Sequence, residues 1–108
     1  MDQKMYDELV RGLLSIFPEQ AVQIVLYGST ARGTATPESD IDIAVFLREK
    51  LDGEQEDQLS GLIVDMNLKY GKVFSVIDID QQTYLKWRGV TPFYQNVDRE
   101  GIVLWKAA

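Results

Sequence analysis

Residues 25–47 read VLYGSTARGTATPESDIDIAVFL, and this stretch decides the fold. A run of apolar and β-branched residues predicts a strand over 21–27, and Gly28 ends it. Small and polar residues follow, and a second apolar run predicts another strand over 41–47. The stretch therefore predicts two strands of one sheet that are joined by a polar loop.

Two aspartates, Asp40 and Asp42, begin the second of these strands. Side chains alternate along a strand, so both aspartates share one face, with starting points about 7 Å apart. At that spacing both can hold one divalent cation, or a pair of cations about 3.5–4 Å apart. Without a cation, the two charges repel each other and favour protonation of one carboxylate. The alternative that both simply stay in water at the mouth of a loop is open at this point.

The Gly28-Ser29 turn lies between the first strand and an expected short helix over 30–33. A strand that turns into a helix exposes backbone N–H groups, which suit a phosphate. The alternative is an ordinary turn in which Ser29 is the helix N-cap. Neighbouring strands lie about 4.8 Å apart, so the turn and the aspartates together would bring a phosphate cradle next to a metal site. Nucleotidyl transfer requires both features.

The rest of the chain continues to alternate between helices and strands. Further helices are expected over 2–17, 55–70 and 81–88, a turn or short helix over 92–96, and strands over 73–79 and 102–105. This order predicts an α/β or α+β fold with about four strands, whose helices pack mostly on one face of the sheet. A length of 108 residues predicts one domain over 1–108.

Composition excludes several classes of function. The chain has no histidine and no cysteine, so histidine-based catalysis and thiolate metal sites are excluded, and oxygen-ligated cations such as Mg²⁺ are left. The net charge of −6 argues against a nucleic-acid partner bound through its backbone. No apolar run approaches the ~20 residues of a membrane span, and the acidic N-terminal stretch does not resemble a signal peptide. A cytoplasmic protein is expected.

The motif GSTARGTATPESDID, residues 28–42, resembles that of the polymerase β-type nucleotidyltransferase superfamily, and specifically of its minimal nucleotidyltransferase (MNT) members. The late stretches VFSVIDID and FYQNVDREGIVLW are also similar to those small proteins. The resemblance implies a small mixed sheet flanked by helices, the polymerase β palm-like core. It also implies Mg²⁺ as the metal and ATP as the donor of a nucleotidyl group.

The resemblance assigns roles to five residues. Asp40 and Asp42 would be catalytic metal ligands, and Gly28 and Ser29 would bind the nucleotide. Arg32 would support the phosphates or the acidic loop, although a solvated helix arginine remains an equal alternative.

The third acidic residue of the superfamily is not obvious in this chain. Aligned on the family's later strand, its position falls on Ser75, while Asp78 matches a second, structural aspartate. Alternation places Ser75 and Asp78 on opposite faces unless the strand contains a bulge. Three possibilities stay open: Asp78 is catalytic through an irregular strand, Asp65 reaches in from the preceding helix, or the site binds nucleotide with little turnover. Asp80 is expected to cap the next helix.

The chain has no room for a domain that binds an acceptor, so the acceptor would arrive on another molecule. The minimal family implies an antitoxin that transfers AMP to a tyrosine of a HEPN-type toxin, and an acidic protein suits a protein partner. The alternatives are a catalytically weak module that neutralises its partner by contact, and a freestanding metal- or nucleotide-binding protein. A homo-oligomer also stays open. Late aromatic residues would form either the partner surface or the core: Trp87, Phe93, Tyr94 and Trp105.

Overall fold

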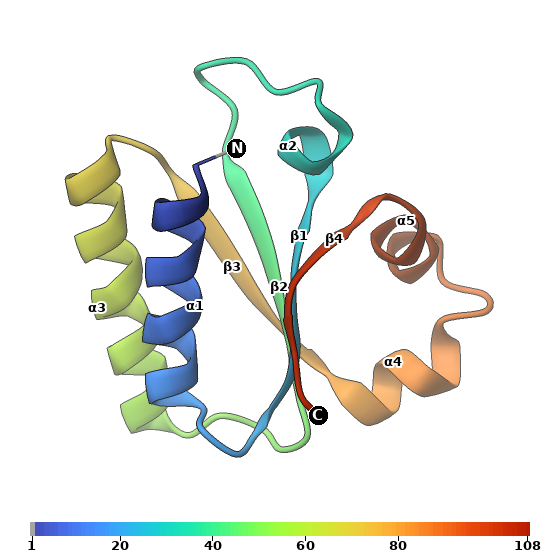
Figure 1. The fold of residues 1–108 in the computed structure, drawn as a ribbon. Coiled ribbons are helices and arrows are strands. Elements are labelled where there is room, and N and C mark those ends of the chain that lie inside the picture. Colours follow the sequence, from blue (N-terminus) through green and yellow to red (C-terminus); the bar gives the residue numbers. More distant parts are fainter. Residues whose placement is uncertain (1) are drawn as a thin grey trace.

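The computed structural model describes residues 2–108 and contains nine helices and strands in that range (Figure 1). In chain order they are α1 (Gln3–Ile16), β1 (Ala21–Tyr27), α2 (Gly28–Arg32), β2 (Ile41–Leu47), α3 (Gly53–Tyr70), β3 (Phe74–Asp80), α4 (Gln81–Trp87), α5 (Pro92–Glu100) and β4 (Ile102–Lys106). The expected order of elements is confirmed. The main difference is α5, which continues to Glu100 as a full helix where a turn or short helix over 92–96 was expected.

The four strands form one mixed sheet in the order β3-β2-β1-β4. Strand β1 is antiparallel to both β2 and β4, whereas β2 and β3 are parallel. The predicted fold class is thus confirmed. The glycine turn follows β1 and the aspartates begin β2, and these are the two central strands of the sheet. They pair directly with each other, and each has a further strand on its outer side.

Helices cover both faces of the sheet, and the expectation that they pack mostly on one face is wrong. Figure 1 shows α1 and α3 on one side and α4 and α5 on the other. The cause lies in β2, whose side chains from Ile43 to Leu47 are at most 2% exposed on either face. An apolar strand of this kind needs cover on both sides.

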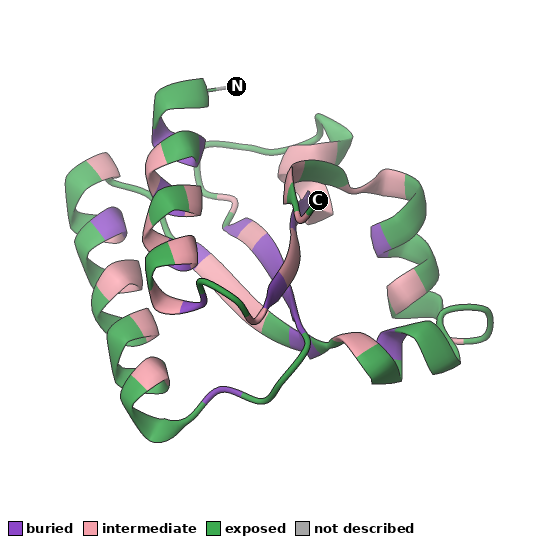
Figure 2. Ribbon diagram, turned by 60° about the horizontal axis from the view of Figure 1, so that its bottom comes forward, coloured by how far each residue is buried: buried purple, intermediate pink, exposed green. Residues whose placement is uncertain are grey.

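The buried residues fall into two clusters, one on each face of the sheet. Figure 2 shows burial along the central strands and on the sheet-facing sides of the helices. The first cluster joins α1 and α3 to the sheet and includes Leu9, Leu13, Phe17, Ile24, Leu26, Ile43, Val45 and Met66. The second joins α4 and α5 to the sheet and consists of Val25, Ala44, Phe46, Ile79, Tyr84 and Val97.

The late aromatic residues differ in burial, and the structure confirms the core role for two of them. Trp105 packs against the first cluster and Tyr94 against the second, so these two contribute to the core. Trp87 and Phe93 are 46% and 39% exposed, so much of their apolar surface faces solvent.

Local signals explain several helix boundaries. Asp52 caps α3 in a reciprocal capping box with Gln55, and Gly71 ends that helix in the left-handed conformation. Asp80 accepts a hydrogen bond from the Thr83 backbone N–H, 3.1 Å away, which confirms it as the N-cap of α4. Within residues 2–108 no helix has both the length and the apolar character that a membrane span requires.

Candidate functional site

The glycine turn and Asp42 are in direct contact. Tyr27 at the end of β1 pairs with Asp42 in β2, so the next residue, Gly28, lies against the Asp42 side chain. Gly28 has φ +74°, a conformation that favours glycine. A Cβ added there would press on the carboxylate, 3.2 Å from Asp42 Cγ and closer still to Oδ2. The glycine therefore makes room for the carboxylate to sit at the turn.

Asp42 is half-buried, and its surroundings make its charge costly. Burial raises the pKa of the Asp42 carboxyl, and the nearby Asp40 carboxylate raises it further, while Arg32 partly offsets both. Asp40 is exposed at the entrance to the strand. The two aspartates thus act on each other on one face, as alternation predicted, with Asp42 deep in the site and Asp40 on its open side.

Ser29 lies in the first turn of α2 and is not its N-cap, so the alternative of an ordinary serine cap is not what the structure shows. The N-cap is Tyr27, whose side chain makes no capping hydrogen bond. The turn is closed instead at the other end, where Gly33 has φ +77° and the Thr34 N–H donates to the Ser29 carbonyl over 3.0 Å. Ser29 therefore lies at the N-terminal end of the helix, where backbone N–H groups have no intrahelical partner.

The third-carboxylate position is occupied by Ser75. In the parallel pairing of β2 and β3, Ser75 is the direct partner of Asp42, so both side chains share a face. The register runs without a shift from Phe74 to Asp80, and β3 therefore contains no bulge that could reorient Asp78.

Asp78 is not brought to this site. Its partner is Val45, which is buried in the cluster under α1 and α3, on the face opposite Asp42. Asp78 also lies three residues, about 10 Å, further along the strand than Ser75. Asp65 is no nearer, because it lies on α3 beside a hollow lined by Gly12 and Ser15 of α1. We therefore propose neither aspartate as a catalytic residue.

The donor set is suited to a hard cation that shares its ligands with a substrate. Among residues 2–108, no group of three acidic, histidine or cysteine side chains converges. The Asp40 carboxylate lies close enough to Asp42 to raise the pKa of its carboxyl, and a bound cation would relieve this repulsion. Mg²⁺ commonly takes one or two protein carboxylates and completes its shell with phosphate oxygens and water. The residues present fit that arrangement.

Arg32 forms an ion pair with Glu100, the last residue of α5. Its Nη1 lies 3.3 Å from Oε2 of Glu100, so the arginine is neither free in solvent nor directed only at the aspartates. Between α2 and α5 lies a recess of about 190 Å³, lined by Tyr27, Gly28, Arg32, Phe93, Asn96, Val97 and Glu100. We call it the α2–α5 recess. Its α5 residues carry no local motif that predicts a site, and the one signal for them in the sequence is the resemblance of FYQNVDREG to the minimal family.

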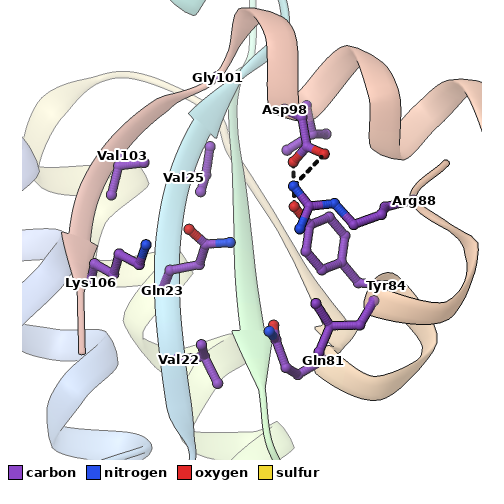
Figure 3. Close-up of a pocket in the computed structure, with 12 residues that line it drawn as sticks. Val22, Gln23, Val25, Gln81, Tyr84, Arg88, Asp98, Gly101, Val103 and Lys106 are labelled. Carbon is purple, nitrogen blue, oxygen red and sulfur yellow. Dashed lines mark hydrogen bonds and ion pairs between the residues drawn. The ribbon is translucent and has the colours of Figure 1, made fainter. Parts of the chain in front are cut away.

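A second hollow of about 270 Å³ lies between α4, α5 and strands β1 and β4 (Figure 3). It includes none of Gly28, Asp40 or Asp42. Figure 3 shows the Tyr84 hydroxyl and the Arg88 guanidinium both meeting the Asp98 carboxylate. These contacts join α4 to α5, which in turn supports the wall of the α2–α5 recess.

Comparison with known proteins identifies the family. The nucleotidyltransferase domain matches residues 7–94. The chain belongs to the nucleotidyltransferase domain family. This membership supports an enzyme of the transferase class, and the resemblance to minimal nucleotidyltransferases is confirmed.

A curated relative and two solved structures cover nearly the whole nucleotidyltransferase chain. "Putative protein adenylyltransferase MJ0604" of Methanocaldococcus jannaschii is 34% identical over 108 residues, which are 96% of this chain and 98% of that protein. A toxin–antitoxin structure with AMP-PNP has a TM-score of 0.65 at 23% identity, covering 99% of this chain and 75% of its own. The structure of the tri-AMPylated Shewanella oneidensis HEPN toxin in complex with MNT antitoxin has a TM-score of 0.63 at 22% identity. That match covers 99% of this chain and 74% of the matched chain. At these identities the two structures show the fold.

Proposed function

We propose that residues 1–108 form one nucleotidyltransferase domain that transfers AMP from ATP to a hydroxyl group of a partner protein. The observation that carries the proposal is the contact of Gly28 with the Asp42 carboxylate. In our proposal the glycine turn binds phosphate, and it lies beside the two carboxylates that would hold a cation. Positioning and charge neutralisation are the main requirements of phosphoryl-type transfer.

Each residue of the turn and the strand has a task in this proposal. Asp40 and Asp42 would hold Mg²⁺, and the ion would supply neutralisation of the charge on the phosphates. Ser29 and the backbone N–H groups of the first turn of α2 bind phosphate oxygens. Arg32 adds a positive charge at the edge of the site, close enough to lower the pKa of the Asp42 carboxyl.

The relatives support the substrate and the partner. The archaeal relative is named as an adenylyltransferase that acts on protein. The structural neighbours are toxin–antitoxin complexes, one with an ATP analogue and one with an AMPylated HEPN toxin. We therefore place a HEPN-type toxin as the partner and a toxin tyrosine as the acceptor.

A second candidate function follows from Ser75. Its neutral hydroxyl stands opposite Asp42, where the superfamily has a carboxylate. A site without that carboxylate lacks one metal ligand and the nearest candidate base for an attacking hydroxyl. The second candidate is a module that neutralises its partner by contact, with slow turnover or none.

Labelling of the partner tests the first function. Purified protein is incubated with a HEPN-type partner, radiolabelled ATP and Mg²⁺, and the products are separated on a gel. Asp42→Asn is expected to lower labelling at least about a hundredfold, because one carboxylate of the cation pair is lost. Asp78→Asn, a matched change on the opposite face, is expected to label like wild type. Equal labelling by both variants would contradict the assigned roles.

Neutralisation separates the two functions. If transfer is the mode of action, an Asp40→Asn/Asp42→Asn double variant fails to protect cells from the toxin. Full protection by the double variant, with an intact complex, would establish the contact mode instead.

A further inference from the structure

The connection between α4 and α5 concentrates apolar side chains that face solvent. Large apolar residues are exposed at nine positions of the described range 2–108, and Trp87, Val90 and Phe93 are three of them within seven positions. Their exposed fractions are 46%, 68% and 39%. Exposed apolar residues that occur singly need no explanation, whereas a group of them marks an interaction site. We call these three side chains the 87–93 surface.

Hydrogen bonds hold this connection in one shape. The Val90 and Thr91 N–H groups both donate to the Trp87 carbonyl, over 3.0 and 2.9 Å. The Gln95 side chain of α5 donates to the Gly89 carbonyl over 2.8 Å, which ties the connection to the helix that follows. An apolar surface that is already ordered loses little conformational freedom when a partner covers it.

The 87–93 surface adjoins the proposed transfer site. The Phe93 ring stands edge-to-face against Tyr27, with ring centroids 5.6 Å apart. Phe93 also lines the α2–α5 recess together with Gly28. Tyr27 in turn pairs with Asp42 across the two central strands. A protein that covers Phe93 therefore lies next to the glycine turn and the Asp42 carboxylate.

The local charge indicates the chemistry of the partner. Residues 81–97 contain Lys86 and Arg88 and no acidic side chain, although the whole chain has a net charge of −6. Arg88 is paired with Asp98, whereas Lys86 takes part in none of the ion pairs formed within residues 2–108. The Lys86 ammonium lies 5.3 Å from the centre of the Trp87 ring, so a positive charge borders the apolar surface. Complementary charges on the partner are carboxylates.

We propose that the 87–93 surface docks the acceptor protein, through an apolar patch on that protein that is bordered by acidic side chains. The inference rests on the proposed function, because it takes the acceptor hydroxyl to be carried by another protein. Aromatic residues such as Trp87 and Phe93 are enriched in the buried centre of interfaces. A standard interface buries about 800 Å² on each partner, so the three side chains form its centre and not its whole extent.

Calorimetric titration with the HEPN-type partner of the labelling experiment tests the proposal on the full chain. Trp87→Ala is expected to raise the Kd at least about tenfold, because a central aromatic anchor is lost. Val90→Asp is expected to raise it at least as much, because it sets a carboxylate against the acidic border of the partner. Val64→Asp makes the same change at a 53% exposed position of α3 and is expected to leave the Kd at the wild-type value.

Two further measurements separate docking from folding and from nucleotide binding. The Tm of each variant and its affinity for AMP-PNP with Mg²⁺, both measured without the partner, are expected to match wild type. Lys86→Glu is expected to raise the Kd for the partner more at low salt than at high salt, because salt screens the attraction that it removes. Lys50→Glu, the same change at another exposed lysine, is the matched control.

The outcomes distinguish this inference from the proposed function. If Trp87→Ala and Val90→Asp bind the partner as wild type does, the surface does not dock it, and the transfer function stands. If both variants lose affinity but wild type does not label the bound partner, docking stands and transfer fails. A wild type that binds no HEPN-type partner overturns the inference together with the proposed partner.

Other occupants of the surface give different results. A wild-type dimer in size-exclusion chromatography that Val90→Asp converts to a monomer would assign the surface to a second copy of this chain and overturn the proposal. Binding of single-stranded RNA by wild type and not by Trp87→Ala would assign it to nucleic acid, with the same consequence.

Discussion

At the scale of single residues, the site depends on what Gly28 lacks. A side chain at this position would occupy the space of the Asp42 carboxylate, and the φ of +74° is also unfavourable for other residues. Gly33, five residues later, has nearly the same backbone conformation, φ +77°, but no atom within 4 Å of an added Cβ. Both positions therefore favour glycine because of their positive φ, but only Gly28 also needs the absence of a side chain to make room for Asp42.

Alanine at each glycine tests this distinction. Gly28→Ala and Gly33→Ala are both expected to lower the free energy of unfolding by about 1 kcal/mol, because each forces alanine into the left-handed region. Only Gly28→Ala is expected to abolish Mg²⁺-dependent nucleotide binding, because its methyl group displaces the carboxylate. Urea denaturation and nucleotide titration measure the two effects. Equal nucleotide affinity in the two variants would show that the contact is not needed for binding.

At the scale of elements, Tyr84 couples α4 to α5 and both to the sheet. Its ring packs edge-to-face against Phe46 of β2 and Tyr94 of α5, with ring centroids 4.7 Å and 5.5 Å apart. Its hydroxyl donates a hydrogen bond to the Asp98 carboxylate. Burial, together with the hydrogen bond to the Asp98 carboxylate, raises the pKa of Tyr84 to about 12. The tyrosine is therefore a neutral donor at every physiological pH.

Removal of this hydroxyl has a predictable pH dependence. Tyr84→Phe is expected to cost about 1–2 kcal/mol at pH 7, since a hydrogen bond to a charged acceptor is lost. The unfolded tyrosine ionises near pH 10, and the folded one near 12. Between these values the unfolded state of wild type releases its proton first, so the advantage of wild type shrinks as pH rises. Denaturant titrations of both proteins at pH 8, 10 and 11.5 measure it, and a constant difference would contradict the assigned pKa.

At the scale of the whole molecule, the proposed metal ligand Asp42 lies in the most buried strand of an acidic protein with net charge −6. An ionised Asp42 is a cost to the folded state whenever no cation is bound. Its pKa is raised in the fold, so its relative contribution to stability is fully present below about pH 3.8, its ordinary value, and is lost as pH rises through the folded pKa.

Asp42→Asn should therefore stabilise the metal-free protein. In EDTA at pH 7 its Tm is expected to exceed that of wild type by about 2–5 °C, the shift produced by less than about 1 kcal/mol in a domain of this size. The advantage should vanish towards pH 3.5, where both side chains are neutral. Mg²⁺ with AMP-PNP should raise the Tm of wild type and not that of the variant. A lower Tm for the variant in EDTA would show that Asp42 makes a stabilising interaction in the absence of metal.

The whole fold also shows which features the sequence makes predictable. The shared face of Asp40 and Asp42, and the separation of Ser75 from Asp78, follow from strand alternation, which acts over two or three residues. The ion pair between Arg32 and Glu100 spans 68 positions, and no local pattern predicts it. The side of the sheet taken by α4 and α5 was equally hard to predict, because it depends on which face of β2 lacks cover after α1 and α3 have packed.

The strand order has a consequence for the growing polypeptide. Strand β1 lies between β2, which follows it closely, and β4, which begins only at Ile102. When residue 90 has just left the exit tunnel of the ribosome, the glycine turn and both aspartates are already outside it. Glu100 and strand β4, the second neighbour of β1, are still inside. The nascent chain thus contains the groups proposed to bind phosphate and the cation well before β4, and one edge of the central strand β1 stays unpaired in between.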